Sequence, residues 1–370
     1  MGFRQCALEK MGMKLFSDIF RGKRVLVTGH TGFKGSWLAL WLDRLGAEVT
    51  GVALAPNSDP NHWELLGLGI DDRRGDIRDL DGLNRIFSDK QPEIVFHLAA
   101  QALVRDSYRD PVETWSSNVI GTVNVLEASR NCPSVKAVVV VTTDKCYENQ
   151  EWTWGYREID RLGGHDPYSA SKAAAELVVA SYRKSFFHSE RNIAVATARA
   201  GNVIGGGDWS DCRLVPDVVR AIAMNTSLEI RSPKAIRPWQ HVLEALSGYL
   251  MLGQQLLRGN REFADAWNFG PDNEGNLSVE GILSMLQGYW PEMRWHLTGE
   301  SQPHESQLLR LDCSKACSSL NWHPVWNSEE AIKATAEWYS SYKNAGLVIS
   351  NLQLDAYIDN AAMKHLGWTA

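Results

Sequence analysis

The sequence has 370 residues, of which 44% are hydrophobic and 22% are charged, a balance typical of a globular protein with one large or two medium domains. Its formal net charge of −6 argues against a nucleic-acid-binding surface over the whole molecule. The sequence contains no run of about 20 apolar residues that could span a bilayer. We therefore expect neither a nucleic-acid partner nor a membrane partner.

The six cysteines form no C-x-x-C pair, and no histidines lie beside them at the spacing of a zinc site. They predict reduced thiols in a cytoplasmic protein, and no metal is expected. The first 20 residues carry charges throughout and lack the apolar core of a signal peptide. We expect them to form a loosely packed leader.

From residue 23 onward, short apolar segments alternate with segments of helical periodicity. The first unit is a strand at 23–28, a Gly-rich loop at 29–35, a helix at 36–45 and a strand at 47–54. The alternation continues with helices expected at 77–89, 111–131 and 167–187 and strands expected at 93–99, 135–142 and 193–200. This order predicts an α/β protein with a doubly wound, Rossmann-type parallel sheet.

After about residue 201 the pattern becomes irregular, and prolines interrupt short segments. We expect the Rossmann domain to occupy residues 20–200, with returning segments at about 235–270. Residues 201–370 are expected to form mainly a smaller, mixed α/β domain that binds the substrate.

A G-x-x-G-x-x-G loop, formed by Gly29, Gly32 and Gly35, lies between the first strand and its helix. Glycines there permit a tight turn and let backbone N–H groups approach a pyrophosphate, whose charge the helix N-terminus favours. The loop therefore predicts a nicotinamide dinucleotide site, in which Asp76 can accept a hydrogen bond from the adenine amine. The expected cofactor contacts are Gly29, Thr31, Gly32, Phe33, Lys34, Gly35, Asp76, Ile77, Leu98, Ala99, Ala100, Thr142, Tyr168, Lys172 and Ala200.

The second strand ends at Val52-Ala-Leu-Ala-Pro56, without the acidic residue that usually binds the ribose 2′-hydroxyl of NAD. Asp59 is the nearest carboxylate, and no arginine in this stretch replaces it to receive the 2′-phosphate of NADP. We expect NAD rather than NADP.

Tyr168 and Lys172 are spaced so that both project from one face of the helix expected at 167–187. A nearby ammonium lowers the pKa of a phenol and can hold the nicotinamide ribose hydroxyls. The phenolate can then accept the proton of an alcohol while hydride leaves its carbon. Together with the Gly-rich loop, this pair predicts alcohol oxidation.

Several motifs, namely TGHTGFKG, HLAAQ, NVIGT, VTTDK and YSASK, resemble those of the extended short-chain dehydrogenases that modify nucleotide sugars. The resemblance runs from about residue 23 to about residue 324. Within that family, 4,6-dehydratases carry Thr-Asp-Glu where this sequence has Thr143-Asp144-Lys145. The Thr-Asp-Lys version, together with RPWQHVLE at 237–244 and LDCSKA at 311–316, resembles the CDP-glucose 4,6-dehydratases.

The resemblance implies dehydration of CDP-glucose to CDP-4-keto-6-deoxyglucose, a step in deoxysugar biosynthesis of the lipopolysaccharide O-antigen type. Tyr168 would deprotonate the C4 hydroxyl, with Thr143 hydrogen-bonded to the same oxygen, while hydride passes to NAD. Asp144 would protonate the leaving C6 oxygen if burial raises its pKa. Lys145 would act as the C5 base if neutral, or would stabilise the enolate if charged, and we favour the direct role.

The family also implies substrate contacts and an assembly. The expected substrate-binding residues are Asn202, Arg213, Leu214, Arg237 and Arg310. A homodimer through the helices expected at 111–131 and 167–187 is implied as well. The open alternatives are a 4-epimerase, a 4,6-dehydratase of GDP-, UDP- or dTDP-hexoses, and a non-catalytic NAD-binding regulator, the last expected to lack Tyr168 or Lys172.

Overall fold

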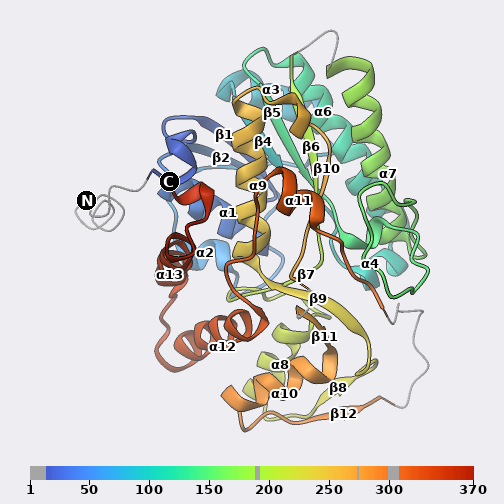
Figure 1. Cartoon of the computed structure of the whole chain (residues 1–370), viewed down its shortest axis with the longest axis vertical. Coiled ribbons are helices and arrows are strands. Elements are labelled where there is room, and N and C mark those ends of the chain that lie inside the picture. Colours follow the sequence, from blue (N-terminus) through green and yellow to red (C-terminus); the bar gives the residue numbers. More distant parts are fainter. Residues whose placement is uncertain (1–13, 188–191, 273–274, 299–307) are drawn as a thin grey trace.

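Seven parallel strands form the central sheet in a computed structural model that describes residues 14–187, 192–272, 275–298 and 308–370 (Figure 1). The order across the sheet is β10-β6-β5-β4-β1-β2-β3, and every neighbouring pair is parallel. The predicted doubly wound Rossmann sheet is confirmed. Its strands are β1 (Arg24–Thr28), β2 (Glu48–Ala53), β3 (Asp71–Arg74), β4 (Ile94–His97), β5 (Ala137–Val141), β6 (Ala194–Ala200) and β10 (Ala266–Phe269).

Helices cover both faces of this sheet. The all-buried strand β5 shows why, because Val139 packs into one hydrophobic cluster while Val138 and Val140 pack into the other. The first cluster is completed by α1 (Phe33–Arg44), α9 (Val242–Leu257) and α13 (Ser350–Met363). The second is completed by α3 (Leu80–Lys90), α6 (Gly121–Asn131) and α7 (Pro167–Tyr182).

A smaller unit lies beyond the carboxyl ends of the main strands (Figure 1). It contains a three-stranded sheet in the order β11-β9-β7 and a pair formed by β12 and β8. Its elements are β7 (Asn202–Ile204), α8 (Leu214–Ala223), β8 (Leu228–Ile230), β9 (Ile236–His241), β11 (Asn276–Ser278), α10 (Val279–Tyr289) and β12 (Trp295–Leu297). The remaining helices are α2 (His62–Leu66), α4 (Val104–Arg109), α5 (Pro111–Trp115), α11 (Ser314–Ser319) and α12 (Ser328–Ala345).

Two predicted helices differ in detail from expectation. The helix expected at 111–131 consists of α5, a π-helical turn at Ser116–Ile120 and α6, and the helix expected at 167–187 ends in a π-helical turn at Arg183–Phe187. The helix expected from Ile77 begins only at Leu80, because the side chain of Asp79 accepts a hydrogen bond from Gly82 N and caps it.

The expectation of a loose leader is wrong for the described residues before β1. Leu15, Phe16 and Phe20 are buried in the core. Phe16 stacks on Trp368, with ring centroids 5.1 Å apart, and meets Trp41 edge-on. Residues 1–13 lie outside the described part of the chain.

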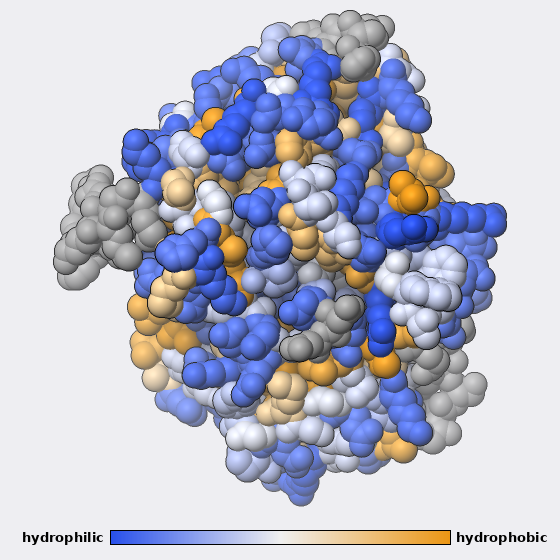
Figure 2. Space-filling model, in the orientation of Figure 1, coloured by the Kyte–Doolittle hydropathy of each residue, from blue (hydrophilic) through white to orange (hydrophobic). Residues whose placement is uncertain are grey.

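The surface is ordinary for a globular fold on the face drawn in Figure 2, where hydrophilic residues predominate and hydrophobic ones form small groups. Among the helices described, none combines the length and the hydrophobicity that a transmembrane segment needs. The cysteines within the described ranges are free thiols.

Candidate functional site

A cavity of about 1140 Å³ opens where the carboxyl ends of β1, β4, β5 and β6 face the smaller unit. This edge is where open parallel sheets place their ligands. Gly29, Leu98, Thr142 and Gly201 line it from the main sheet. A single space is therefore shared by the Gly-rich loop, helix α7 and the smaller unit.

The Gly-rich loop can be built only with glycine at two positions. Gly29 has φ +78°, and a Cβ there would lie 2.6 Å from the backbone nitrogen of Ala99. A Cβ on Gly35 would lie 2.0 Å from the carbonyl oxygen of Gly29. Gly32 precedes α1 and gives its first turn no side-chain cap, so backbone N–H groups of that turn stay available for a ligand. The loop fits the pyrophosphate of a dinucleotide.

All of the predicted cofactor contacts line the cavity, and several of them, Asp76 and Thr142 among them, also have side-chain partners within the protein. Asp76 accepts hydrogen bonds from Arg78 Nε at 3.0 Å to both carboxylate oxygens. Thr142 donates its hydroxyl to Glu176 at 2.5 Å. The Thr142 hydroxyl is therefore directed towards Glu176.

The tip of β2 has an arginine beside it that sequence reasoning missed. Arg74, at the end of β3, donates from Nη1 to the carbonyl oxygen of Leu54 at 3.0 Å. Its Nη2 is paired with Asp72 at 2.8 Å, which partly neutralises its charge. The arginine reaches the tip through the pairing of β3 with β2, which no local sequence pattern shows.

Tyr168 and Lys172 lie on one face of α7, which Asp166 caps by accepting a hydrogen bond from Ser169 N. Burial raises the pKa of Tyr168 to about 12, and a hydrogen bond with Thr143 opposes part of that rise. Burial lowers the pKa of Lys172 to about 8, and the Glu176 carboxylate opposes that shift. Lys172 also donates from Nζ to the carbonyl oxygen of Val141 at 3.2 Å, so α7 is attached to β5.

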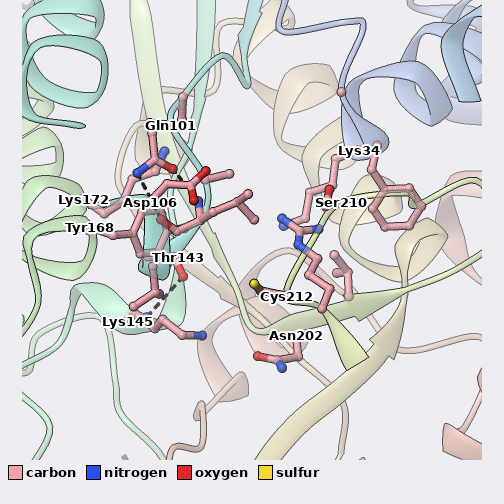
Figure 3. A pocket seen from close by; sticks show the side chains of 18 of the residues that line it. Lys34, Gln101, Asp106, Thr143, Lys145, Tyr168, Lys172, Asn202, Ser210 and Cys212 are labelled. Atoms are coloured by element: carbon pink, nitrogen blue, oxygen red, sulfur yellow. Dashed lines mark hydrogen bonds between the residues drawn. The ribbon is translucent and has the colours of Figure 1, made fainter. Parts of the chain in front are cut away.

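Thr143 lies two residues after the end of β5 and caps a short 3₁₀ turn that begins with Asp144 and Lys145. The Thr143 hydroxyl donates to Asp144 Oδ1 at 2.9 Å, and Lys145 Nζ lies 3.7 Å from the same oxygen. Asp144 is buried beneath the cavity lining, and its Oδ2 has no hydrogen-bond partner among the described residues. Figure 3 shows Thr143, Lys145, Tyr168 and Lys172 on one side of the cavity and Lys34 on the other.

The smaller unit brings most of the predicted substrate residues to the same cavity. Asn202, Arg213, Leu214 and Arg237 line it, and Arg213 pairs with Asp208 at 3.0 Å. Arg310 is not among the lining residues. Its Nη1 instead contacts the carbonyl oxygen of Thr153 at 3.5 Å.

Sequence reasoning assigned no role to Gln101 and Asn118, although both stand in recognisable motifs. Asn118 accepts a hydrogen bond from Gln101 N and donates one to Ser171 Oγ, each at 2.9 Å. These contacts fix the loop after β4 against α7. Glu176, one turn beyond Lys172, was also missed, because its partners Thr197 and Arg199 come from a distant strand.

Comparison with known proteins agrees with this geometry. The sequence profile of the NAD-dependent epimerase/dehydratase family matches residues 25–268. The chain is 48% identical over 332 residues to a CDP-glucose 4,6-dehydratase of Salmonella typhimurium, covering 88% of this chain and 92% of that protein. It is 27% identical to a dTDP-glucose 4,6-dehydratase of Xanthomonas campestris pv. campestris, covering 85% of this chain and 92% of that protein.

Among solved structures, a double mutant of the dTDP-glucose 4,6-dehydratase DesIV from Streptomyces venezuelae, determined with NAD, has the same fold. Its TM-score is 0.73 at 22% identity, covering 87% of this chain and 98% of that chain. The chain therefore belongs to the NAD-dependent epimerase/dehydratase family.

Proposed function

We propose that this protein is a hydro-lyase that uses NAD to convert CDP-D-glucose into CDP-4-keto-6-deoxy-D-glucose. One observation carries the proposal: Lys145 lines the cavity that the Gly-rich loop enters, beside Thr143 and Tyr168, and the buried Asp144 lies directly beneath them, in contact with Thr143 and Lys145. Tyr168 and Lys172 alone serve any reversible alcohol oxidation. The added acid and amine supply what elimination of water requires. The Salmonella relative, a CDP-glucose 4,6-dehydratase, supports CDP-glucose as substrate.

In the oxidation step, Tyr168 accepts the proton of the sugar C4 hydroxyl and Thr143 hydrogen-bonds the same oxygen. NAD, when bound, supplies the site that takes up the C4 hydride and later returns it to C6. The Gly-rich loop holds its pyrophosphate, and Lys172 holds its nicotinamide ribose. Each of these side chains lines the cavity.

In the elimination step, the 4-keto group acidifies the C5 proton, and the C6 oxygen departs as water. The base must be uncharged and the acid protonated, whereas Lys145 and Asp144 form an ion pair at 3.7 Å. Transfer of one proton from Nζ to the carboxylate gives a neutral amine for C5 and a carboxylic acid for the C6 oxygen.

Substrate binding is assigned mainly to residues 201–370, and cofactor binding to the Rossmann domain at 20–200 with its returning segments. Asn202, Leu214 and the arginines at 213 and 237 are placed to hold the CDP moiety, because guanidinium groups bind diphosphates in two-pronged geometry. A direct contact from Arg310 remains a prediction.

We also propose a homodimer through α5, the adjoining π-helical turn and α7. Val112, Ile120 and Leu177 on these helices are 78%, 52% and 62% exposed, and Trp115 is 41% exposed. Apolar side chains gathered on neighbouring helices are typical of a surface that is covered by a partner. Ile120→Glu is expected to shift the protein from dimer to monomer in sedimentation equilibrium, whereas a wild-type monomer would exclude this interface.

Substrate identity is tested by incubation with CDP-, dTDP-, GDP- and UDP-linked hexoses, scoring loss of water by mass. We expect CDP-glucose to yield the 4-keto-6-deoxy product, and Tyr168→Phe, as a matched control, to yield none. Conversion of another nucleotide sugar but not CDP-glucose would contradict the substrate assignment. A product of unchanged mass with an inverted C4 would instead identify a 4-epimerase.

A further inference from the structure

The carboxylate of Glu176 joins three elements beneath the catalytic site. It lies on α7, one turn after Lys172, and is buried. Its Oε1 accepts hydrogen bonds from Thr142 Oγ1 at 2.5 Å and Arg199 Nε at 2.9 Å. Its Oε2 accepts from Thr197 Oγ1 at 2.7 Å and Arg199 Nη2 at 2.8 Å. The catalytic helix is thereby bound to both β5 and β6.

The bond from Thr142 places this carboxylate next to the reacting groups. Thr142 directly precedes Thr143, whose hydroxyl contacts Asp144. Lys172 Nζ meets the carbonyl oxygen of Val141, on the other side of Thr142. Two contacts thus set the distance between the strand end that carries Thr143 and the helix that carries Tyr168 and Lys172.

The charge of Glu176 also bears on Lys172. Burial on its own would raise the pKa of Glu176, but the charge and hydrogen bonds of Arg199 outweigh it and leave that pKa below its usual value. The carboxylate is therefore ionised near neutral pH. It is the largest influence that opposes the burial of Lys172, followed by Cys146.

Other groups around Lys172 offer no equivalent negative charge. His97 is neutral, because burial lowers its pKa to about 3, and Lys34, across the cavity, is an amine whose pKa burial lowers to about 7. Arg199, which balances Glu176, also donates to Tyr147 Oη at 2.8 Å.

We propose that Glu176 is a positioning residue, which fixes the end of β5 against α7 and keeps Lys172 protonated for the cofactor. Glu176 is not among the residues that line the cavity, and it acts through Thr142 and Lys172. The effect on turnover rests on the proposed function. The effect on Lys172 can be measured with NAD alone.

A matched pair of isosteric variants tests the positioning. Thr142→Val and Thr197→Val each remove one hydroxyl that donates to Glu176 from a buried strand position. Only Thr142 adjoins the catalytic Thr143. We expect Thr142→Val to lower kcat by about 10-fold or more with little change in KM, since small misplacements of reacting groups are costly. Thr197→Val should lower Tm about as much as Thr142→Val does, because each loses one hydrogen bond to Glu176, but it should keep kcat within about twofold of the wild-type value. Equal kcat values for the two variants would overturn the positioning role.

Glu176→Gln tests the electrostatic role through the pH dependence of NAD+ affinity, measured by calorimetry. Lys172 is protonated below its pKa, so wild-type affinity should decline as the pH rises through about 8. In Glu176→Gln the decline should begin about one pH unit lower or more, because a neighbouring anion has been lost. Thr197→Val should match the wild type. An unchanged profile would overturn this role.

Should Glu176→Gln fail to fold, Thr142→Val and Thr197→Val still decide the positioning role. If the wild type binds NAD+ but converts no nucleotide sugar, the proposed function fails. The calorimetric test of Glu176 does not depend on that outcome, because it needs only NAD+.

Discussion

Replacement of Thr143 with valine removes a single hydroxyl at the point where Tyr168 and Asp144 meet. That hydroxyl donates its one proton to Asp144 Oδ1 at 2.9 Å. When the hydroxyl turns to donate to Tyr168 instead, this hydrogen bond holds down the pKa of the phenol, which burial raises to about 12. A hydrogen bond to an ionised group contributes about 1.5–3 kcal/mol. Its loss therefore raises the pKa of Tyr168 by about 1–2 units. Because the ionised fraction of Tyr168 falls in proportion, C4 oxidation should slow about 10- to 100-fold at a fixed pH.

The assay isolates this step by following the transient NADH absorbance in a single turnover with CDP-glucose, using sugar that carries deuterium at C4. Below the pKa of Tyr168 the rate should rise with pH, since ionisation produces the base, and it should level off near pH 8 as Lys172 loses its proton. Thr143→Ser keeps the hydroxyl and should retain most of the rate. An unchanged rate in Thr143→Val, or an equal loss in Thr143→Ser, would refute the reasoning.

Three further outcomes follow from buried contacts. Gly35→Ala should weaken NAD+ binding about 10- to 100-fold in a calorimetric titration, because its Cβ would lie 2.0 Å from the Gly29 carbonyl oxygen; unchanged affinity would contradict the tight turn. Burial raises the pKa of Glu244 from 4.5 to about 7, so the unfolded chain ionises first and this group costs stability as pH rises between those values. In urea unfolding, the free energy of unfolding of Glu244→Gln should rise by about 3 kcal/mol relative to wild type between pH 4.5 and pH 7. A difference in free energy between the two proteins that does not change with pH would refute this prediction. Phe16→Ala should lower the free energy of unfolding by about 3–5 kcal/mol, since its ring is buried against Trp368; a loss no larger than that of an exposed Leu352→Ala control would argue against that packing.

Local patterns were enough to predict the Gly-rich loop and the pair formed by Tyr168 and Lys172. Their chemistry depends on spacing within one strand, one turn and one helix, which the sequence displays directly. The fold class was predictable for the same reason, because β5 is continuously apolar and parallel strands are covered on both faces.

Other features depend on contacts between distant segments. Phe16 was expected to be loose, because its partner Trp368 comes from the other end of the chain. Arg74 reaches the tip of β2 only through strand pairing. Arg310, which the family resemblance implied as a substrate contact, lies beside Thr153 and is not among the residues that line the cavity. Such placements follow from tertiary packing, which single-segment patterns do not encode.

The route of the chain between β6 and β11 constrains how substrate specificity can be altered. The chain leaves the main sheet after β6, builds β7, β8 and β9, returns through α9 to add β10, and leaves again for β11 and β12. Because β9 pairs with β7 on one side and β11 on the other, the smaller unit, to which we assign substrate binding, is formed by two separate segments of the chain. A chimera of two relatives with a single junction between β7 and β11 would take part of this unit from each parent. A chimera that imports another nucleotide preference must exchange both segments together and leave α9 and β10 in place.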